Sequence, residues 1–122
     1  MEFSFINLVN IIIGLGIFNV WIIRFNKKTS FRGGDALNLK EEFQVYGLPT
    51  WFMYTVGFLK LLFALLIILG IWYTTISIYA VYGMSILMIG AIIMHYRVND
   101  PLKKYVPALS LLILLLTLII NY

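Results

Sequence analysis

The side chains best suited to chemistry in this chain are one lysine, one histidine, a tyrosine and two consecutive glutamates. Lys60 lies inside an apolar stretch, and His95, the single histidine, lies near the end of another. Glu41 and Glu42 belong to a polar segment, and Tyr46 follows Glu42 at helical spacing. A lysine inside hydrocarbon is costly and is usually paired with an acid. We therefore expect these five residues to form one polar cluster.

The sequence contains none of the constellations typical of a self-contained enzyme. It has no glycine-rich nucleotide loop, zinc-ligand spacing or nucleophile elbow, and one histidine without a nucleophile builds no catalytic triad. Because cysteine is absent, disulfides, thiolate metal sites and dithiol electron relays are excluded. We expect no catalytic residue and no metal, and the ligands compatible with the cluster are a lipid or a quinone.

Three interpretations of the polar cluster remain open at this stage. Lys60 could pair with Glu41 or Glu42 only to fasten the polar segment to the rest of the protein. Alternatively, Lys60 and His95 could leave room for an anionic or quinone-like headgroup. In the third interpretation, the glutamate, lysine and histidine pass protons in a small transporter or redox subunit. Consecutive helical residues point about 100° apart, so only one glutamate should reach inward.

Four apolar stretches indicate the fold class. They cover residues 3–25, 51–73, 76–96 and 105–121, and each is close to the ~20 residues that cross a bilayer. Hydrophobic residues make up 62% of the chain and charged residues only 11%, far from the balance of soluble proteins. Small and polar residues recur on one stripe of each stretch, as in helices that pack in lipid. The sequence predicts an all-α integral membrane protein, a four-transmembrane-helix bundle forming a single domain over residues 1–122.

The distribution of charge predicts the orientation in the membrane. The lysines and arginines of the connections are Arg24, Lys27, Lys28, Arg32 and Lys40 in the first and Arg97, Lys103 and Lys104 in the third. Since basic residues favour the cytoplasmic side, both termini should lie outside the cytoplasm. The net charge of +4 is then explained by topology and by contact with membrane lipids, and not by nucleic acid.

The connection over residues 26–50 is longer than adjacent helices require, which is typical of a structured, functional loop. Gly33-Gly34 should form a turn, and residues 38–46 a short amphipathic helix that buries Leu39, Phe43 and Tyr46. After the third span, Asp100 is placed to cap the next turn. Pro107 is expected in the first turn of the fourth span, where a missing N–H costs little.

Several blocks of sequence resemble the DoxX-like family of small four-span bacterial membrane proteins. They are Phe31-Arg32-Gly33-Gly34, Glu41-Glu42-Phe43, Tyr46-Gly47-Leu48-Pro49 with Trp51, Gly57 with Lys60, and His95 with Asp100-Pro101 and Lys103-Lys104-x-x-Pro107-Ala108. The resemblance covers essentially the whole chain and implies a four-helix bundle in the bacterial cytoplasmic (inner) membrane. The family's namesake is a membrane subunit associated with thiosulfate:quinone oxidoreduction. A thiol mechanism cannot be transferred to a chain without cysteine.

The expected function combines the cluster and the resemblance. The chain should be a small accessory membrane protein whose cytoplasmic-side polar pocket binds a lipid, a quinone-like ligand or a partner membrane protein. It could also act as a homo-oligomer. The alternative is a proton-coupled redox or transport subunit.

Overall fold

All regular structure in the described part of the chain is helical. The computed structural model describes residues 4–27, 29 and 31–121. Its elements are α1 (Phe5–Phe18), the π-helical turn η1 (Asn19–Ile23), α2 (Leu39–Val45), α3 (Thr50–Leu69), α4 (Thr74–Arg97) and α5 (Leu102–Ile120). Four helices, the first being α1 continued by η1, are long and apolar enough to cross a membrane. The protein is therefore an all-α, multi-pass membrane protein, as the sequence predicts.

The ends of the last helix differ from the range expected from hydropathy. Asn99 adopts a positive φ of 57° and Pro101 has an extended backbone, so α5 can begin at Leu102. Pro107 consequently lies inside α5 and not in its first turn. Because proline has no N–H, it cannot donate the usual helical hydrogen bond to the carbonyl four residues earlier. The expectation that Pro107 sits at a cost-free position was therefore wrong.

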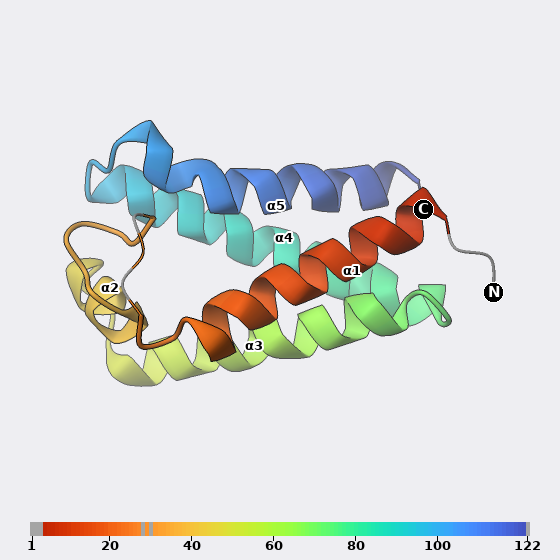
Figure 1. Ribbon diagram of the computed structural model, residues 1–122, viewed down its shortest axis with the longest axis horizontal. Helices are drawn as coiled ribbons and strands as arrows, with labels where there is room; N and C mark the ends of the chain where they lie inside the picture. The colour runs from red at the N-terminus through yellow and green to blue at the C-terminus, as the bar shows by residue number, and fades with distance from the viewer. Residues whose placement is uncertain (1–3, 28, 30, 122) are drawn as a thin grey trace.

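The long helices form a bundle in which α3 packs against α4 and α4 against α5, while α1 crosses the face of α3 (Figure 1). The start of α1 and the end of α5 lie at one end, and α2 lies at the other. Each long helix contributes to one buried core, which includes Val9, Ile13, Ile17, Met53, Ala64, Ile67, Ala80, Val81, Met84, Met88, Ala108, Leu115 and Leu118. The buried faces of α1, α3 and α4 include small and polar residues such as Asn10, Ala64 and Ser77, whereas the polar Ser110 of α5 and Asn121 after it are exposed.

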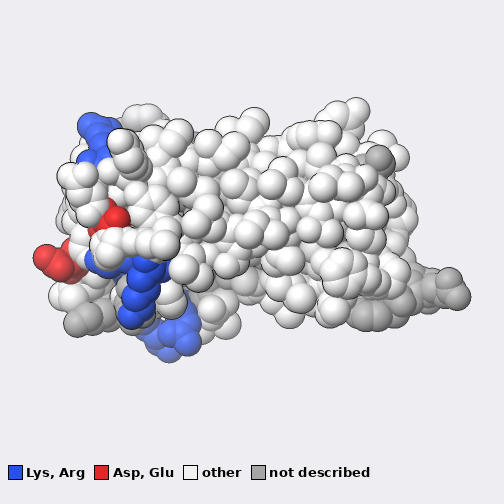
Figure 2. Space-filling view, turned by 90° about the horizontal axis from the view of Figure 1, so that it is seen from above, with Lys and Arg blue, Asp and Glu red and all other residues white. Residues whose placement is uncertain are grey.

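Charged side chains gather at the α2 end of the molecule. Figure 2 shows lysine, arginine, aspartate and glutamate at this end, and uncharged side chains over the remaining length of the visible face. The apolar length is what a bilayer can surround, and the charged end is what water and headgroups can solvate. The polar site described below lies at the boundary between these two regions.

Helix α2 is fixed at both ends by its own sequence. Asn38 caps its first turn, since its Oδ1 accepts a hydrogen bond from the Glu41 N–H at 2.9 Å. At its other end Gly47 has φ +77°, and Leu48 N–H donates to the carbonyl of Phe43 at 2.9 Å, which together form a Schellman motif. Leu39, Phe43 and Tyr46 are buried. The apolar spacing in the sequence predicts this buried face.

Candidate functional site

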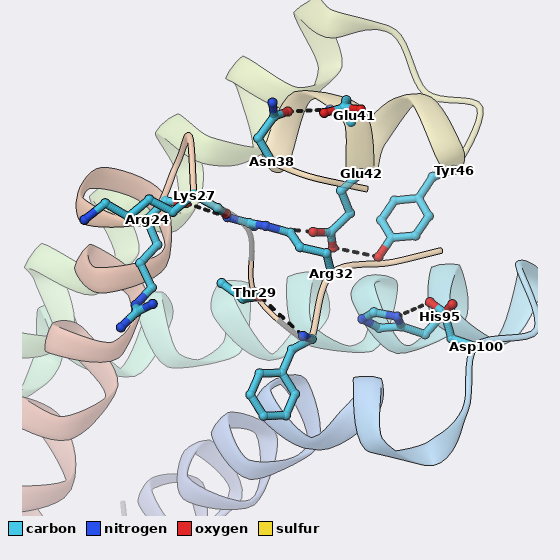
Figure 3. A network of polar contacts seen from close by, with 11 residues as sticks. Arg24, Lys27, Thr29, Arg32, Asn38, Glu41, Glu42, Tyr46, His95 and Asp100 are labelled. Carbon is cyan, nitrogen blue, oxygen red and sulfur yellow. Dashed lines mark hydrogen bonds and ion pairs between the residues drawn. The ribbon is translucent and has the colours of Figure 1, made fainter. Parts of the chain in front are cut away.

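Glu42 is at the centre of the polar network at the charged end (Figure 3). Its carboxylate accepts a hydrogen bond from the Tyr46 hydroxyl at 2.8 Å, and it forms an ion pair with Arg32 at 3.4 Å. Glu41 points elsewhere, because consecutive helical residues face different directions. In the described part of the chain the Glu41 side chain makes no ion pair, although its backbone N–H is bonded to Asn38. Of the two glutamates, Glu42 is the one that faces the site.

Arg32 is the cation that pairs with this glutamate. Its side chain is only 4% exposed, and its Nη2 also donates to the backbone carbonyls of Arg24 and Lys27. Arg32 therefore ties the end of η1 to α2. The interpretation in which Lys60 itself forms the ion pair with a glutamate does not hold among the described residues, because Arg32 from the loop pairs with Glu42. The sequence alone does not identify Arg32 as this partner.

Lys60 is held from α3 against an aromatic ring of η1. Its Nζ lies 5.3 Å from the centroid of the Trp21 ring, a cation–π contact. Gly57 makes this approach possible, since a Cβ there would lie 2.6 Å from a ring atom of Trp21. No carboxylate of the described residues lies within 4 Å of Nζ. The lysine thus faces the site without an ion-pair partner.

His95 is paired with an acid that lies five residues later in the chain. Its Nδ1 lies 2.7 Å from the carboxylate of Asp100, and both side chains are buried. A Schellman motif creates this pair: Asn99 takes the left-handed conformation, and the Asp100 N–H donates to the His95 carbonyl at 3.0 Å. The chain therefore folds back and presents the Asp100 carboxylate to the histidine ring.

Asp100 also joins the third connection to the first. Its other oxygen accepts the Gly34 N–H at 2.9 Å and lies 3.8 Å from Lys104 Nζ, which donates to the Gly34 carbonyl. The prediction that Asp100 caps the following turn was wrong, because α5 begins at Leu102 after the N-cap residue Pro101, and no side chain caps its first turn. The signal that could have located it is an asparagine at the C-terminal end of a helix, immediately before an acid.

The ring of Tyr46 connects the two halves of the network. It meets the His95 ring edge-on with the ring centroids 5.9 Å apart, and the Tyr105 ring centroid lies 5.4 Å from that of His95. Gly33 passes so close that a Cβ would lie 2.5 Å from the Tyr46 hydroxyl. Burial first, and then the adjacent Glu42 carboxylate, raise the pKa of Tyr46 above its usual range. The phenol therefore remains a hydrogen-bond donor.

Phe31, Gly34 and Pro49, which belong to the sequence blocks that resemble the DoxX-like family, shape the connection over residues 26–50. Phe31 lies beneath Lys103, whose Nζ is 6.0 Å from the ring centroid. Gly34 has φ +56°, a conformation that suits glycine. Pro49 has an extended backbone and precedes the first residue of α3. These residues set the path of the chain.

A large cavity lies beneath this network and unites the predicted site residues. Its volume is about 990 Å³, and its lining includes Arg32, Glu42, Tyr46, Lys60 and His95. Glu41 is not part of the lining. The remaining wall is mostly apolar and comes from α1, η1, α3, α4 and α5, including Ile17, Val20, Trp21, Phe52, Val56, Leu87, Ala91, Leu111 and Leu114. The cavity therefore has a polar end beneath the loop and an apolar body between the helices.

The cavity also has a glycine in its wall. Gly90 of α4 lines it, and a Cβ added there would meet no atom within 4 Å. On the facing helices, Gly16 of α1 lies near Leu111 of α5, whose Cδ2 would be 3.7 Å from an added Cβ. Gly90 thus offers a position where a larger side chain would occupy the cavity without displacing the backbone.

Comparison with known proteins assigns the family. The model of the DoxX-like family matches residues 33–118, which is more than half of the chain and includes every cavity residue from α2 to α5. No match was found among curated proteins or among solved structures. The region matched contains Gly33-Gly34, Glu42, Tyr46, Lys60, His95 and Asp100. The chain belongs to the DoxX-like family.

Proposed function

We propose that this protein is a small accessory membrane protein that binds an amphipathic ligand, a lipid or a quinone-like molecule, in the cavity beneath its loop. The observation that carries the proposal is the division of one cavity into a polar end and an apolar body. A headgroup would lie among Glu42, Tyr46, Lys60 and His95, and its chain would lie between the helices. Binding pockets typically have such apolar walls with a few convergent polar groups.

The proposal includes the orientation of the protein. The lysines and arginines that Figure 2 shows gather at the α2 end, and under the positive-inside rule this supports a cytoplasmic position for that end. The cavity would then take its headgroup from the inner leaflet of a bacterial cytoplasmic membrane, with both termini outside. Loading such a ligand would serve a partner membrane protein or a second copy of this chain.

A second candidate is a proton-coupled redox or transport subunit. The pairing of His95 Nδ1 with Asp100 favours it, because an acid at one ring nitrogen fixes the tautomer and leaves Nε2 to accept a proton. His95 lines the cavity, so a ligand that gives up protons could meet that nitrogen. This candidate requires a ligand that changes its redox or protonation state.

Filling the cavity tests the proposed function. Gly90→Phe should occupy the apolar body, whereas Gly90→Ala adds one methyl group to open space and serves as the matched control. The full-length protein and both variants would be extracted in mild detergent, and bound small molecules and stoichiometry would be measured together by native mass spectrometry. We expect Gly90→Phe to lose copurifying amphiphile while Gly90→Ala retains it. Equal retention by Gly90→Phe in a folded protein would refute binding in this cavity.

A further inference from the structure

The charges around the cavity do not cancel. Four cations line it, Arg24, Arg32, Lys60 and Lys104, and the acid in its lining is Glu42. Glu42 is engaged by Arg32 at 3.4 Å, and Lys104 lies 3.8 Å from Asp100. Lys60 is left facing the cavity with an aromatic ring as its contact. Arg24 is exposed and is screened by solvent. The remaining charges, Arg32, Lys60 and Glu42, leave one positive charge uncompensated at the polar end.

Arg32 provides a second observation. Arg32 is 4% exposed, and its Nε is buried without a hydrogen-bond partner among the described residues. Buried polar groups are rarely left unpaired, since an unmade hydrogen bond costs the full desolvation of the group. Arg32 and Lys60 both line the cavity, the first from the loop and the second from α3.

We propose that the cavity selects amphiphiles whose headgroup carries an anionic phosphate. This inference rests on the proposed function and specifies its ligand class. A phosphodiester carries one negative charge, which matches the excess at the polar end. Its non-bridging oxygens can accept from both Lys60 and Arg32, because guanidinium and ammonium groups are standard phosphate partners. A neutral headgroup would leave the Lys60 charge uncompensated next to hydrocarbon, where an unpaired charge is costly.

The experiment compares lipids that share their acyl chains and differ in the headgroup, an anionic phosphoglycerol against an uncharged hydroxyl. Delipidated full-length protein in detergent would be offered phosphatidylglycerol and diacylglycerol with identical acyl chains, and the bound fraction of each would be measured by native mass spectrometry. We expect phosphatidylglycerol to be held about tenfold or more tightly, since hydrogen bonds to charged groups are each worth a factor of that size. Equal retention of the two lipids would overturn the inference.

Variants of Lys60 connect the preference to the site. Lys60→Met should abolish the preference for phosphatidylglycerol, and Lys60→Arg, which keeps the charge, should retain it. A thermal unfolding measurement on each variant identifies any that fail to fold. For such a variant, Lys60→Gln would take its place. An undiminished preference in folded Lys60→Met would contradict the assignment.

Two further measurements distinguish a free phosphate from a phospholipid, and the phosphate inference from the proposed function. If inorganic phosphate binds in a Lys60-dependent manner while phosphatidylglycerol is held no better than diacylglycerol, the anion is a free phosphate and the lipid assignment is overturned. If Gly90→Phe releases both lipids although neither is preferred, the phosphate inference fails and the proposed function stands. If Gly90→Phe releases neither lipid, the proposed function fails as well.

Discussion

His95 Nδ1 lies 2.7 Å from the carboxylate of Asp100, and the same carboxylate accepts the backbone N–H of Gly34 from a connection 66 residues away in sequence. One buried acid therefore fixes the histidine ring and fastens the loop over the cavity. Because both roles depend on the same carboxylate, one substitution removes both. Its effect on the free energy of unfolding measures their combined contribution to stability.

Replacing Asp100 should destabilise the protein more than replacing another acid of the same end. Asp100→Ala removes two buried hydrogen bonds to the carboxylate, and we expect a loss of about 3 kcal/mol in the free energy of unfolding. Asp35 is exposed, so Asp35→Ala should change stability by about 0.5 kcal/mol or less. Chemical unfolding in detergent gives both values. Equal effects of the two substitutions would show that the Asp100 contacts are not formed.

The two neighbouring glutamates should behave differently. Glu42→Ala leaves Arg32 buried without its carboxylate and removes the acceptor of the Tyr46 hydroxyl, and breaking a buried pair typically costs about 3–5 kcal/mol. Glu41→Ala, one residue earlier in the same helical turn, should cost about 1 kcal/mol or less through the helix dipole. Thermal unfolding of both variants in the same detergent provides the comparison. A larger loss for Glu41→Ala would reverse the assignment of the inward-facing glutamate.

Asn99 should be replaceable by glycine but not by a β-branched residue. Its φ of 57° is readily adopted by asparagine or glycine and costs roughly 1–2 kcal/mol for other residues. Asn99→Gly should leave stability nearly unchanged, and Asn99→Val should lower it by at least that amount, since the turn also positions Asp100. Unfolding midpoints of the pair measure the difference. Similar midpoints would mean that the turn does not depend on the left-handed residue.

Tyr46 should remain protonated in the folded protein at alkaline pH. Its pKa is raised by burial and by Glu42, so the folded state keeps this proton at pH values where the unfolded chain, with a phenol pKa near 10, releases it. The contribution to stability is therefore complete below about pH 10 and declines as pH rises above that value.

Phenolate absorbance titration checks this prediction on the folded protein. Up to about pH 11, one unit above the ordinary phenol pKa, the Tyr46→Phe variant should form as much phenolate as the unchanged protein, because Tyr46 keeps its proton in the folded state. A clear loss of phenolate absorbance on Tyr46→Phe would show that the hydroxyl is not buried against Glu42.

A reporter fused after residue 122 tests the orientation. The clustering of cations at the α2 end predicts a C-terminus outside the cytoplasm, so a periplasm-dependent reporter should be active and a cytoplasm-dependent one silent. A fusion in the first connection at the exposed Asp35 should give the opposite pattern. A cytoplasmic C-terminus would move the polar end of the cavity to the outer leaflet.

The sequence by itself determined the features that depend on local spacing and composition. Hydropathy and length define spans, and a short helix buries Leu39, Phe43 and Tyr46 because their spacing follows the helical repeat. The Asn38 cap and the glycine at position 47 are local signals of the same kind. That one glutamate and not both should face inward also follows from helical geometry alone.

Only the tertiary structure decided which partners meet. Periodicity gives the face on which a side chain lies, but not which of several cations reaches a given acid first. Arg32 takes Glu42 because the loop folds back along α2, and Lys60 is left against Trp21. The His95–Asp100 pair requires the turn at Asn99, and its link to Gly34 requires two distant connections to meet. The cavity likewise exists only where six helical elements surround the same space, which no single segment of sequence specifies.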